Sequence, residues 1–319
     1  MNMMKWKIGV ALVLILAILN TASAASIEIE LVGQYDTSGY ASDVVVVGNY
    51  AYIADNIGGL CIVDISDPSD PTIEGILATG ESLNSVTVRD NYAYVTASAF
   101  KGFFIFDISK PSNPIKIGEN RSIDAKDVVV SGNYAYLAGY SGLYAVDISN
   151  PSNPTKVGEY AVLGHAHSVF ILGNYAYVTD FHNGLYIIDI SNPSNPIKVG
   201  QYTGGESFRS VVVSDNYAYV ATTGSCGLCV LDVSDKSNPI RINQYPESAS
   251  DLEVSGDYAY ITTGYGLHVV DMSQSPPVEI GTYNAPLYDL TLSGNYAYIT
   301  SGDKGLYIFK IDITPDTTP

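Results

Sequence analysis

The sequence predicts an all-β fold, a seven-bladed β-propeller of four-stranded blades, from three observations: one recurring phrase, the strand pattern within each recurrence, and the strand count at the two ends. The phrase is Asn-Tyr-Ala-Tyr, with one Asp in place of Asn, and the copies begin at Asn49, Asn91, Asn133, Asn174, Asn216, Asp257 and Asn295. The intervals are 42, 42, 41, 42, 41 and 38 residues. A period near forty, in β-rich units punctuated by Gly, Asn and Pro, is typical of propeller blades.

Each repeat contains four expected strands in a fixed order. The first is a short apolar run such as residues 127–130, and a Gly-Asn or Asp-Asn turn joins it to the Tyr-Ala-Tyr strand as a hairpin. A loop that ends in Gly precedes the third strand, for example residues 185–189. A turn rich in Pro, Asn and Ser, which favour ordered turns, then precedes a fourth strand such as residues 197–202.

The strand count predicts how the ring closes. Six fourth strands are expected, starting at Ile73, Ile115, Thr155, Ile197, Ile240 and Val278. The seventh repeat ends with residues 306–309 and has no fourth strand after it, whereas residues 29–35 near the N-terminus read like one. We expect this N-terminal strand to complete the last blade, which removes an open sheet edge.

Alternation in the second strand predicts how neighbouring blades pack. Tyr175 and Tyr177 should point to one face of the strand, and Ala176 and Val178 to the other. A face of large rings then lies against a face of small residues in the adjacent blade. This arrangement accounts for the 26 Tyr residues without a catalytic role.

The expected third strands at residues 60–64, 144–147 and 267–271, together with the Tyr-Ala-Tyr strands, resemble the LVIVD-repeat family. The resemblance covers residues 27–312. It implies a β-propeller on the surface of, or secreted by, bacteria and archaea, and it implies no defined reaction. The seventh repeat departs from the pattern, because Lys310 stands where the other six have Asp.

The N-terminus predicts export. Lys5 and Lys7 precede an apolar stretch, and a small-residue cleavage site ends at Ala24, so we expect a signal peptide over residues 1–24, the propeller over 25–312 and a linker-like tail over 313–319. No later segment is apolar long enough to span a membrane. The formal net charge is −18 and becomes 13 − 33 = −20 without the leader, which argues against nucleic acid as a partner. We expect a secreted or cell-surface monomer.

Several repeated residues have an expected structural role. The Asp that ends six third strands should cap the following turn: Asp64, Asp107, Asp147, Asp189, Asp232 and Asp271. Cys61 and Cys229 share one strand position, which indicates packing, while Cys226 lies three residues before Cys229 and leaves open a disulfide or a redox or metal-binding pair.

A ring of polar residues opens the seven first strands: Asp43, Ser85, Asp127, Ser168, Ser210, Asp251 and Asp289. Its four carboxylates could bind a divalent cation at the mouth of the central channel. We favour the other interpretation, in which these side chains form hydrogen bonds between neighbouring blades.

The predicted binding surface is the face where the repeats differ, formed by the loop into the first strand and the loop between the second and third strands. Binding residues tend to lie on such loops, held by a rigid scaffold. The residue before the first strand is basic or titratable in three consecutive repeats, Lys126, His167 and Arg209. The other candidate ligand-binding residues on this variable face are His165, His182, Tyr140, Phe181, Phe208, Tyr265 and Tyr288. Such a surface suits an extracellular protein with an acidic segment or a cell-envelope glycan.

Two other functions remain open from the residues alone. His165, His167 and His182, with Asp180 as a fourth ligand, could hold a divalent metal with an open position for water, as in an extracellular metal-dependent enzyme. We favour a chain without catalytic activity and without a cofactor, since other catalytic motifs are missing. A structural component of the cell envelope is the third possibility.

Overall fold

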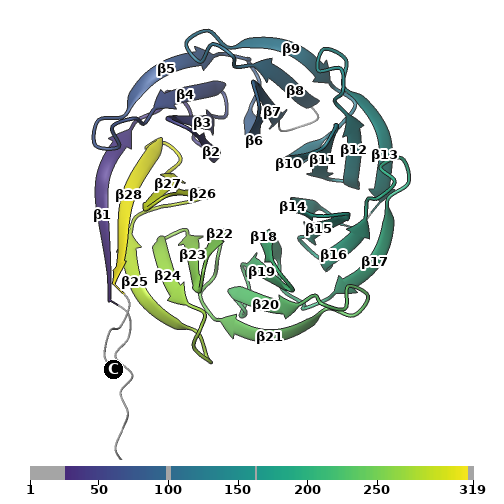
Figure 1. Cartoon of the computed structure of the whole chain (residues 1–319), viewed down its shortest axis with the longest axis vertical. Coiled ribbons are helices and arrows are strands. Elements are labelled where there is room, and N and C mark those ends of the chain that lie inside the picture. The colour runs from purple at the N-terminus through teal and green to yellow at the C-terminus, as the bar shows by residue number, and fades with distance from the viewer. Residues whose placement is uncertain (1–25, 98–101, 162–163, 315–319) are drawn as a thin grey trace, which may run out of the picture.

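The computed structural model describes residues 26–97, 102–161 and 164–314, and these residues form strands and turns without a helix. Figure 1 shows the strands as seven four-stranded antiparallel sheets arranged in a ring, a seven-bladed β-propeller. The strands are β1 (Ser26–Tyr35), β2 (Asp43–Val47), β3 (Tyr50–Ala54), β4 (Leu60–Asp64), β5 (Thr72–Leu77), β6 (Leu83–Arg89), β7 (Tyr92–Ala97), β8 (Gly102–Asp107), β9 (Ile115–Asn120), β10 (Ala125–Ser131), β11 (Tyr134–Gly139), β12 (Gly142–Asp147), β13 (Thr155–Ala161), β14 (Ala166–Leu172), β15 (Tyr175–Asp180), β16 (Gly184–Asp189), β17 (Ile197–Tyr202), β18 (Phe208–Ser214), β19 (Tyr217–Thr222), β20 (Leu228–Asp232), β21 (Ile240–Tyr245), β22 (Asp251–Ser255), β23 (Tyr258–Thr263), β24 (Gly266–Asp271), β25 (Val278–Asn284), β26 (Leu290–Ser293), β27 (Tyr296–Thr300) and β28 (Leu306–Thr314).

Blades 1 to 6 are the consecutive strand quartets from β2–β5 to β22–β25, and the first strand of each lies at the centre of the ring while the fourth lies at the rim (Figure 1). The tight turn between the first two strands needs a positive φ, which Gly adopts freely. Gly132 takes φ 58° there, and in two blades Asp90 and Asp215 take φ 55° and 53° instead. The hairpin expected from the sequence is therefore present in every blade.

Strand β1 lies at the outer edge of blade 7, where the order is β1-β28-β27-β26. It pairs with β28 in antiparallel register from Ser26↔Thr314 to Tyr35↔Leu306. The last blade thus combines strands from the two ends of the chain, visible as the purple and yellow strands side by side in Figure 1. Strand β28 continues to Thr314, two residues beyond the expected end of the propeller.

Blade packing follows the alternation predicted for the second strand. Tyr177 of blade 4 is buried in a cluster with Ala218 and Val220 of blade 5, while Ala176 and Val178 on the opposite face of the same strand pack with blade 3. Large rings thus meet small residues at the joint between blades. The core of the protein is this series of joints, each with its own cluster of buried residues.

Glycine in the fourth strand allows the next blade to approach. A Cβ atom on Gly118 would lie 2.0 Å from the carbonyl oxygen of Pro151 in the Pro-rich turn of the following blade. The same relation joins Gly33 of β1 to Pro68 of blade 1, again at 2.0 Å. The joint made by the N-terminal strand is therefore built like the joints inside the ring.

The repeated Asp residues cap turns as expected. In all six repeats the Asp that ends the third strand accepts a hydrogen bond from the amide of the Ser two residues later, at 2.8–2.9 Å. These bonds lower the pKa of Asp64, Asp107, Asp147, Asp189 and Asp232. Cys226 and Cys229 are joined by a disulfide, and Cys61 is a buried free thiol.

Candidate functional site: the central channel

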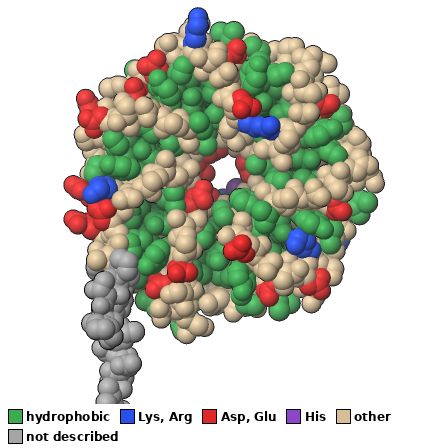
Figure 2. All heavy atoms as spheres, viewed as in Figure 1, with side chains coloured by type: hydrophobic (Ala, Val, Ile, Leu, Met, Phe, Trp, Pro, Cys, Tyr) green, Lys and Arg blue, Asp and Glu red, His purple; other side chains and the backbone are tan. Residues whose placement is uncertain are grey.

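The seven first strands surround a central cavity of about 610 Å³. Figure 2 shows it as an opening in the middle of the ring, edged by acidic side chains and a histidine. The cavity is lined by the polar ring, by the residue before each ring member and by the two residues after it. In blades 2 to 5 the first strand begins earlier than the sequence predicted, so Asn84, Lys126, His167 and Arg209 lie inside β6, β10, β14 and β18. No helix in the described part of the chain is long and apolar enough to span a membrane.

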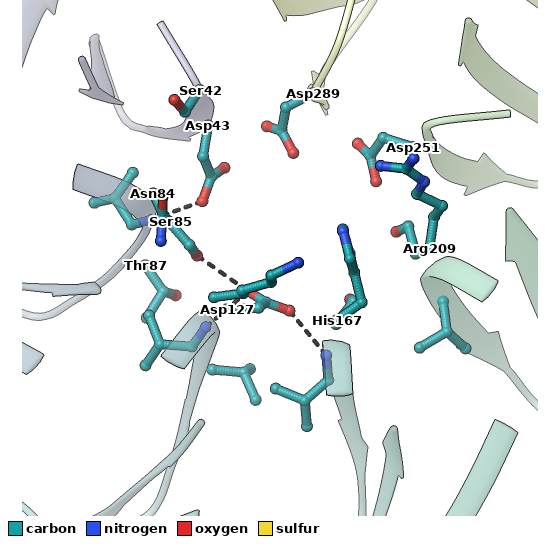
Figure 3. Close-up of a pocket in the computed structure, with 18 of the residues that line it drawn as sticks. Ser42, Asp43, Asn84, Ser85, Thr87, Asp127, His167, Arg209, Asp251 and Asp289 are labelled. Atoms are coloured by element: carbon teal, nitrogen blue, oxygen red, sulfur yellow. Dashed lines mark hydrogen bonds between the residues drawn. The ribbon is translucent and has the colours of Figure 1, made fainter. Parts of the chain in front are cut away.

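The four carboxylates of the polar ring link neighbouring blades. Each Oδ2 atom accepts a hydrogen bond from a backbone amide of the next blade, and the pairs are Asp43 with Val86 at 2.7 Å, Asp127 with Val169 at 2.8 Å, Asp251 with Leu290 at 2.9 Å and Asp289 with Val44 at 3.0 Å. Ser85 Oγ also donates to Asp127 Oδ1 at 3.0 Å, as drawn in Figure 3. The inter-blade interpretation of this ring is confirmed.

Three of these carboxylates come from consecutive blades, because Asp251, Asp289 and Asp43 belong to blades 6, 7 and 1. Burial raises the pKa of all three, and for Asp289, where repulsion from Asp43 and Asp251 adds to burial, the pKa lies well above the usual carboxyl range. A hydrogen bond between the carboxyl groups of Asp43 and Asp289 acts in opposite directions on the pair, lowering the pKa of Asp43 and raising that of Asp289. Glu253 lines the same side of the cavity, and burial together with the charge of Asp251 raises its pKa to about 7. We call Asp43, Asp251, Glu253 and Asp289 the acidic arc.

Lys126, His167 and Arg209 line the cavity together, as their equivalent positions predicted. They come from blades 3, 4 and 5, and Figure 3 shows His167 and Arg209 directed into the opening. We call these three residues the basic arc. In the blade order, Arg209 of blade 5 is followed directly by Asp251 and Glu253 of blade 6, so the two arcs meet at this joint.

Buried threonines fix the backbone of the basic arc. Thr96 Oγ1 donates to the carbonyl oxygen of Lys126 at 3.1 Å, and Thr179 Oγ1 donates to that of Arg209 at 2.7 Å. Both threonines are fully buried at the end of the second strand of the preceding blade. Each cation is therefore positioned by its neighbouring blade, and this gives the arc a rigid support.

The charge state of the basic arc follows from its surroundings. Burial, with the positive charges of Lys126 and Arg209, lowers the pKa of His167 to about 4, so its imidazole is neutral at pH 7. Burial and the charge of Arg209 also lower the pKa of Lys126. Among the described residues, neither Lys126 nor Arg209 forms an ion pair, and Arg209 Nε is buried without a hydrogen-bond partner.

Aromatic side chains connect the two cations across the variable face. Lys126 Nζ lies 5.9 Å from the ring centroid of Tyr140, and Arg209 Cζ lies 5.5 Å from that of Phe181. Between them, His165 is 4.6 Å from Tyr140 and His182 is 5.0 Å from Phe181, measured between ring centroids. The two imidazoles are 5.9 Å apart, so the rings form one continuous row.

The four predicted metal ligands do not converge on one point, although His165 and His182 lie side by side. Within the described ranges, no group of three or more His, Cys, Asp and Glu side chains is placed to hold a metal ion. His165 packs on Tyr140 and His167 faces the channel, while Asp180 Oδ1 accepts bonds from the amides of His182 and Asn183 and so fixes its own loop. The residues are used for packing and loop structure.

The other aromatic candidates lie apart from the channel, except one. Phe208 is 0% exposed and packs in the core against Tyr202, because its strand begins one residue earlier than the cavity-lining positions. Tyr265 is 86% exposed in the turn between β23 and β24, and it does not line the cavity. Tyr288 does line it, with its ring 5.7 Å from that of Tyr40.

Glu253 and the supporting threonines were not predicted. The equivalent residues in the other first strands are Val45, Thr87, Val129, Phe170, Val212 and Thr291, so Glu253 is the one charged residue at this position. Comparing the repeats at that position would have identified it. Thr96 and Thr179 stand two residues after the second Tyr of the repeated phrase, where repeats 6 and 7 also have Thr and the other three have Ala, and the same comparison would have shown them.

Comparison with known proteins identifies the repeat. The LVIVD repeat matches seven times, at residues 38–79, 82–120, 124–162, 163–204, 205–247, 246–285 and 288–318. No curated protein matches the sequence. Among solved structures, the crystal structure of the computationally designed Ika8 protein is similar, with a TM-score of 0.64 and 9% sequence identity over 85% of this chain and 83% of that chain. At this identity the likeness shows the fold alone.

Proposed function

Because the chain belongs to the LVIVD-repeat family, and its seven repeats form a propeller with a charged central channel, we propose that it is a secreted or cell-surface binding module. It holds an extracellular protein or a cell-envelope glycan at the mouth of the channel on the variable face. The observation that carries this proposal is the pair of cations, Lys126 and Arg209, which line a common cavity and form no ion pair with any described residue.

The cost of burying charge supports the proposal. An ionised side chain removed from water is destabilising unless it is paired, and the chain has more than twice as many acidic as basic residues, 33 against 15. Asp124 lines the same cavity and acts electrostatically on Lys126, yet among the described residues no carboxylate forms an ion pair with Lys126 or Arg209. An anionic group of a ligand would supply the missing interaction through charge-assisted hydrogen bonds.

The row of rings supports the same surface. Tyr140 and Phe181 present faces beside the two cations, and aromatic rings combined with Arg are enriched at protein interfaces. Neutral His167 between the cations adds a hydrogen-bond donor and acceptor without further positive charge. An acidic peptide segment or a sugar with acidic substituents fits this combination.

The test is a triple variant, Lys126→Ser/His167→Ser/Arg209→Ser, compared with wild type for binding to isolated cell-envelope fragments. Ser is the residue that Ser42 and Ser250 already provide at the equivalent position, so the fold should be retained. We expect binding to fall by at least about tenfold, since a hydrogen bond to a charged group contributes roughly 1.5–3 kcal/mol. The melting temperature should change little.

A matched control removes the same number of cations elsewhere. Lys110 and Lys198 are exposed and lie outside the loops of the variable face, and the double variant Lys110→Ser/Lys198→Ser also loses two positive charges. Its binding should equal that of wild type. Equal binding by the triple variant and wild type would reject the channel mouth as the site and favour a structural envelope component.

A further inference from the structure

Basic and acidic side chains divide the channel wall unevenly. The basic arc occupies blades 3 to 5 and the acidic arc occupies blades 6, 7 and 1, so Arg209 of blade 5 is followed around the ring by Asp251 of blade 6. Asp124 and Asp127 of blade 3 also line the cavity, in the same sector as Lys126. Figure 3 shows Asp43 and Asp289 on one side of the opening and His167 on the other. Carboxylates therefore line most of the ring, while the lining cations come from blades 3 and 5.

The two arcs do not neutralise each other. Among the described residues, no ion pair joins Arg209 or Lys126 to a carboxylate of the acidic arc, and the one hydrogen bond found for Glu253 comes from the backbone amide of Val254. Elsewhere the chain pairs its charges at short range, for example Lys156 with Glu159 at 2.7 Å. Within the described part of the chain, Lys126, Arg209 and Glu253 thus line the cavity without an ion pair, whereas Asp43, Asp251 and Asp289 accept hydrogen bonds from the neighbouring blade.

We propose that the channel takes a zwitterionic ligand, a small molecule or chain end that carries a carboxylate and an ammonium group. Its carboxylate binds Lys126 and Arg209, and its ammonium group binds Glu253 and the neighbouring carboxylates of the acidic arc. This inference rests on the proposed function, since it names the ligand class of the same site. The free end of a peptide and an amino sugar with an acidic substituent both belong to this class.

The raised pKa values of Glu253 and Asp251 are expected for buried carboxylates that, among the described residues, form no ion pair with a cation. Burial raises the pKa of Glu253 to about 7 and that of Asp251 to about 6, because their negative charges are desolvated and face one another. The other titratable and charged groups that line this cavity are Asp43, Asp124, Asp127, Asp289 and the basic arc. An ammonium group bound at this place would stabilise the ionised carboxylates, so a proton should leave the protein when the ligand binds.

The test is calorimetric titration of the full chain at neutral pH with three probes of similar length: ε-aminocaproate, which carries both charges, caproate, and hexylammonium. We expect ε-aminocaproate to bind about ten- to a hundredfold more tightly than either singly charged probe, the factor given by one additional charge-assisted contact. Repeating the titration in buffers with different ionisation enthalpies should show proton release with ε-aminocaproate and none with caproate.

Variants assign the two ends of the probe. Glu253→Gln should remove the preference for ε-aminocaproate over caproate and abolish the proton release, whereas Glu28→Gln, on exposed β1, should change neither. Arg209→Gln should weaken both carboxylate probes.

Two results would overturn the inference: equal binding of caproate and ε-aminocaproate to wild type, or no binding of any probe. Either leaves the proposed function to be judged separately, by the binding of the triple variant to envelope fragments. If that variant also binds like wild type, both proposals fail.

Discussion

Asp289 accepts a hydrogen bond from the backbone amide of Val44 at 3.0 Å, although the two residues are 245 positions apart in the sequence. The bond joins the last blade to the first. Asp43 makes the equivalent bond to Val86 at 2.7 Å over a separation of only 43 residues. Geometry at the closing joint thus repeats the geometry inside the ring, and this equivalence allows the closure to be tested by single substitutions.

Removing the Asp289 carboxylate should weaken the closing joint. In Asp289→Ala the amide of Val44 loses its acceptor, and a buried donor without a partner costs about 1–3 kcal/mol. Chemical denaturation should show this loss in the free energy of unfolding. The exposed residue Asp70 offers the control, and Asp70→Ala should be within about 0.5 kcal/mol of wild type. A stable Asp289→Ala protein would mean that the bond contributes nothing to closure.

Adding one methyl group to β1 should also destabilise the ring. In Gly33→Ala the new Cβ would meet the carbonyl oxygen of Pro68 at 2.0 Å, and the overpacking should cost roughly 1–3 kcal/mol. Gly264 has open space around it, so Gly264→Ala should leave the melting temperature nearly unchanged. If both variants melt like wild type, β1 does not pack against blade 1 as described.

Glu253 should make the protein less stable as the pH rises. The folded state holds the proton of Glu253 more tightly than the unfolded state, because burial raises its pKa from 4.5 to about 7. The stability that Glu253 contributes is therefore fully present when the pH is below its pKa in the unfolded state, and it is lost as the pH rises through about 7. The difference between the pKa values of Glu253 in the folded and unfolded states corresponds to ~3 kcal/mol in the free energy of unfolding.

The measurement is the melting temperature at about pH 5 and at about pH 8. Wild type should lose stability between them, and Glu253→Gln should lose less, since an amide does not titrate. The lowered pKa of His167 makes the protein more stable as the pH rises, which is opposite to the effect of Glu253. His167 is present in both wild type and Glu253→Gln, so its effect is the same in the two proteins that are compared. An equal change in both proteins would show that Glu253 is not buried in its charged form.

The repeated residues were predictable because seven copies constrain one another. The polar ring, the capping Asp residues and the Tyr-Ala alternation occupy fixed positions, so strand periodicity alone placed them correctly. Lys126, His167 and Arg209 were predictable as neighbours for the same reason, since equivalent positions in adjacent blades lie side by side.

The loop residues were harder to predict because loop conformation depends on contacts that no periodicity encodes. His165 packs on Tyr140 of another blade, and Asp180 caps its own turn, so among the described residues the four expected ligands do not make a group placed to hold a metal ion. Phe208 was taken for a surface ring, but β18 begins at that residue and carries it into the core.

The central claim is that the channel mouth on the variable face binds the partner, and blocking that mouth tests it most directly. Ser250 lines the cavity beside the acidic arc, and Ser250→Trp would place a bulky ring there. Ser112 lies exposed in the Pro-rich turn after β8, where Ser112→Trp adds the same ring away from the cavity. Co-sedimentation with cell-envelope fragments compares the two, after equal melting temperatures establish that both are folded.

We predict that Ser250→Trp loses at least about nine tenths of the binding, equivalent to roughly 1.4 kcal/mol, while Ser112→Trp binds like wild type. Undiminished binding by Ser250→Trp, or loss of binding by Ser112→Trp alone, would contradict the account.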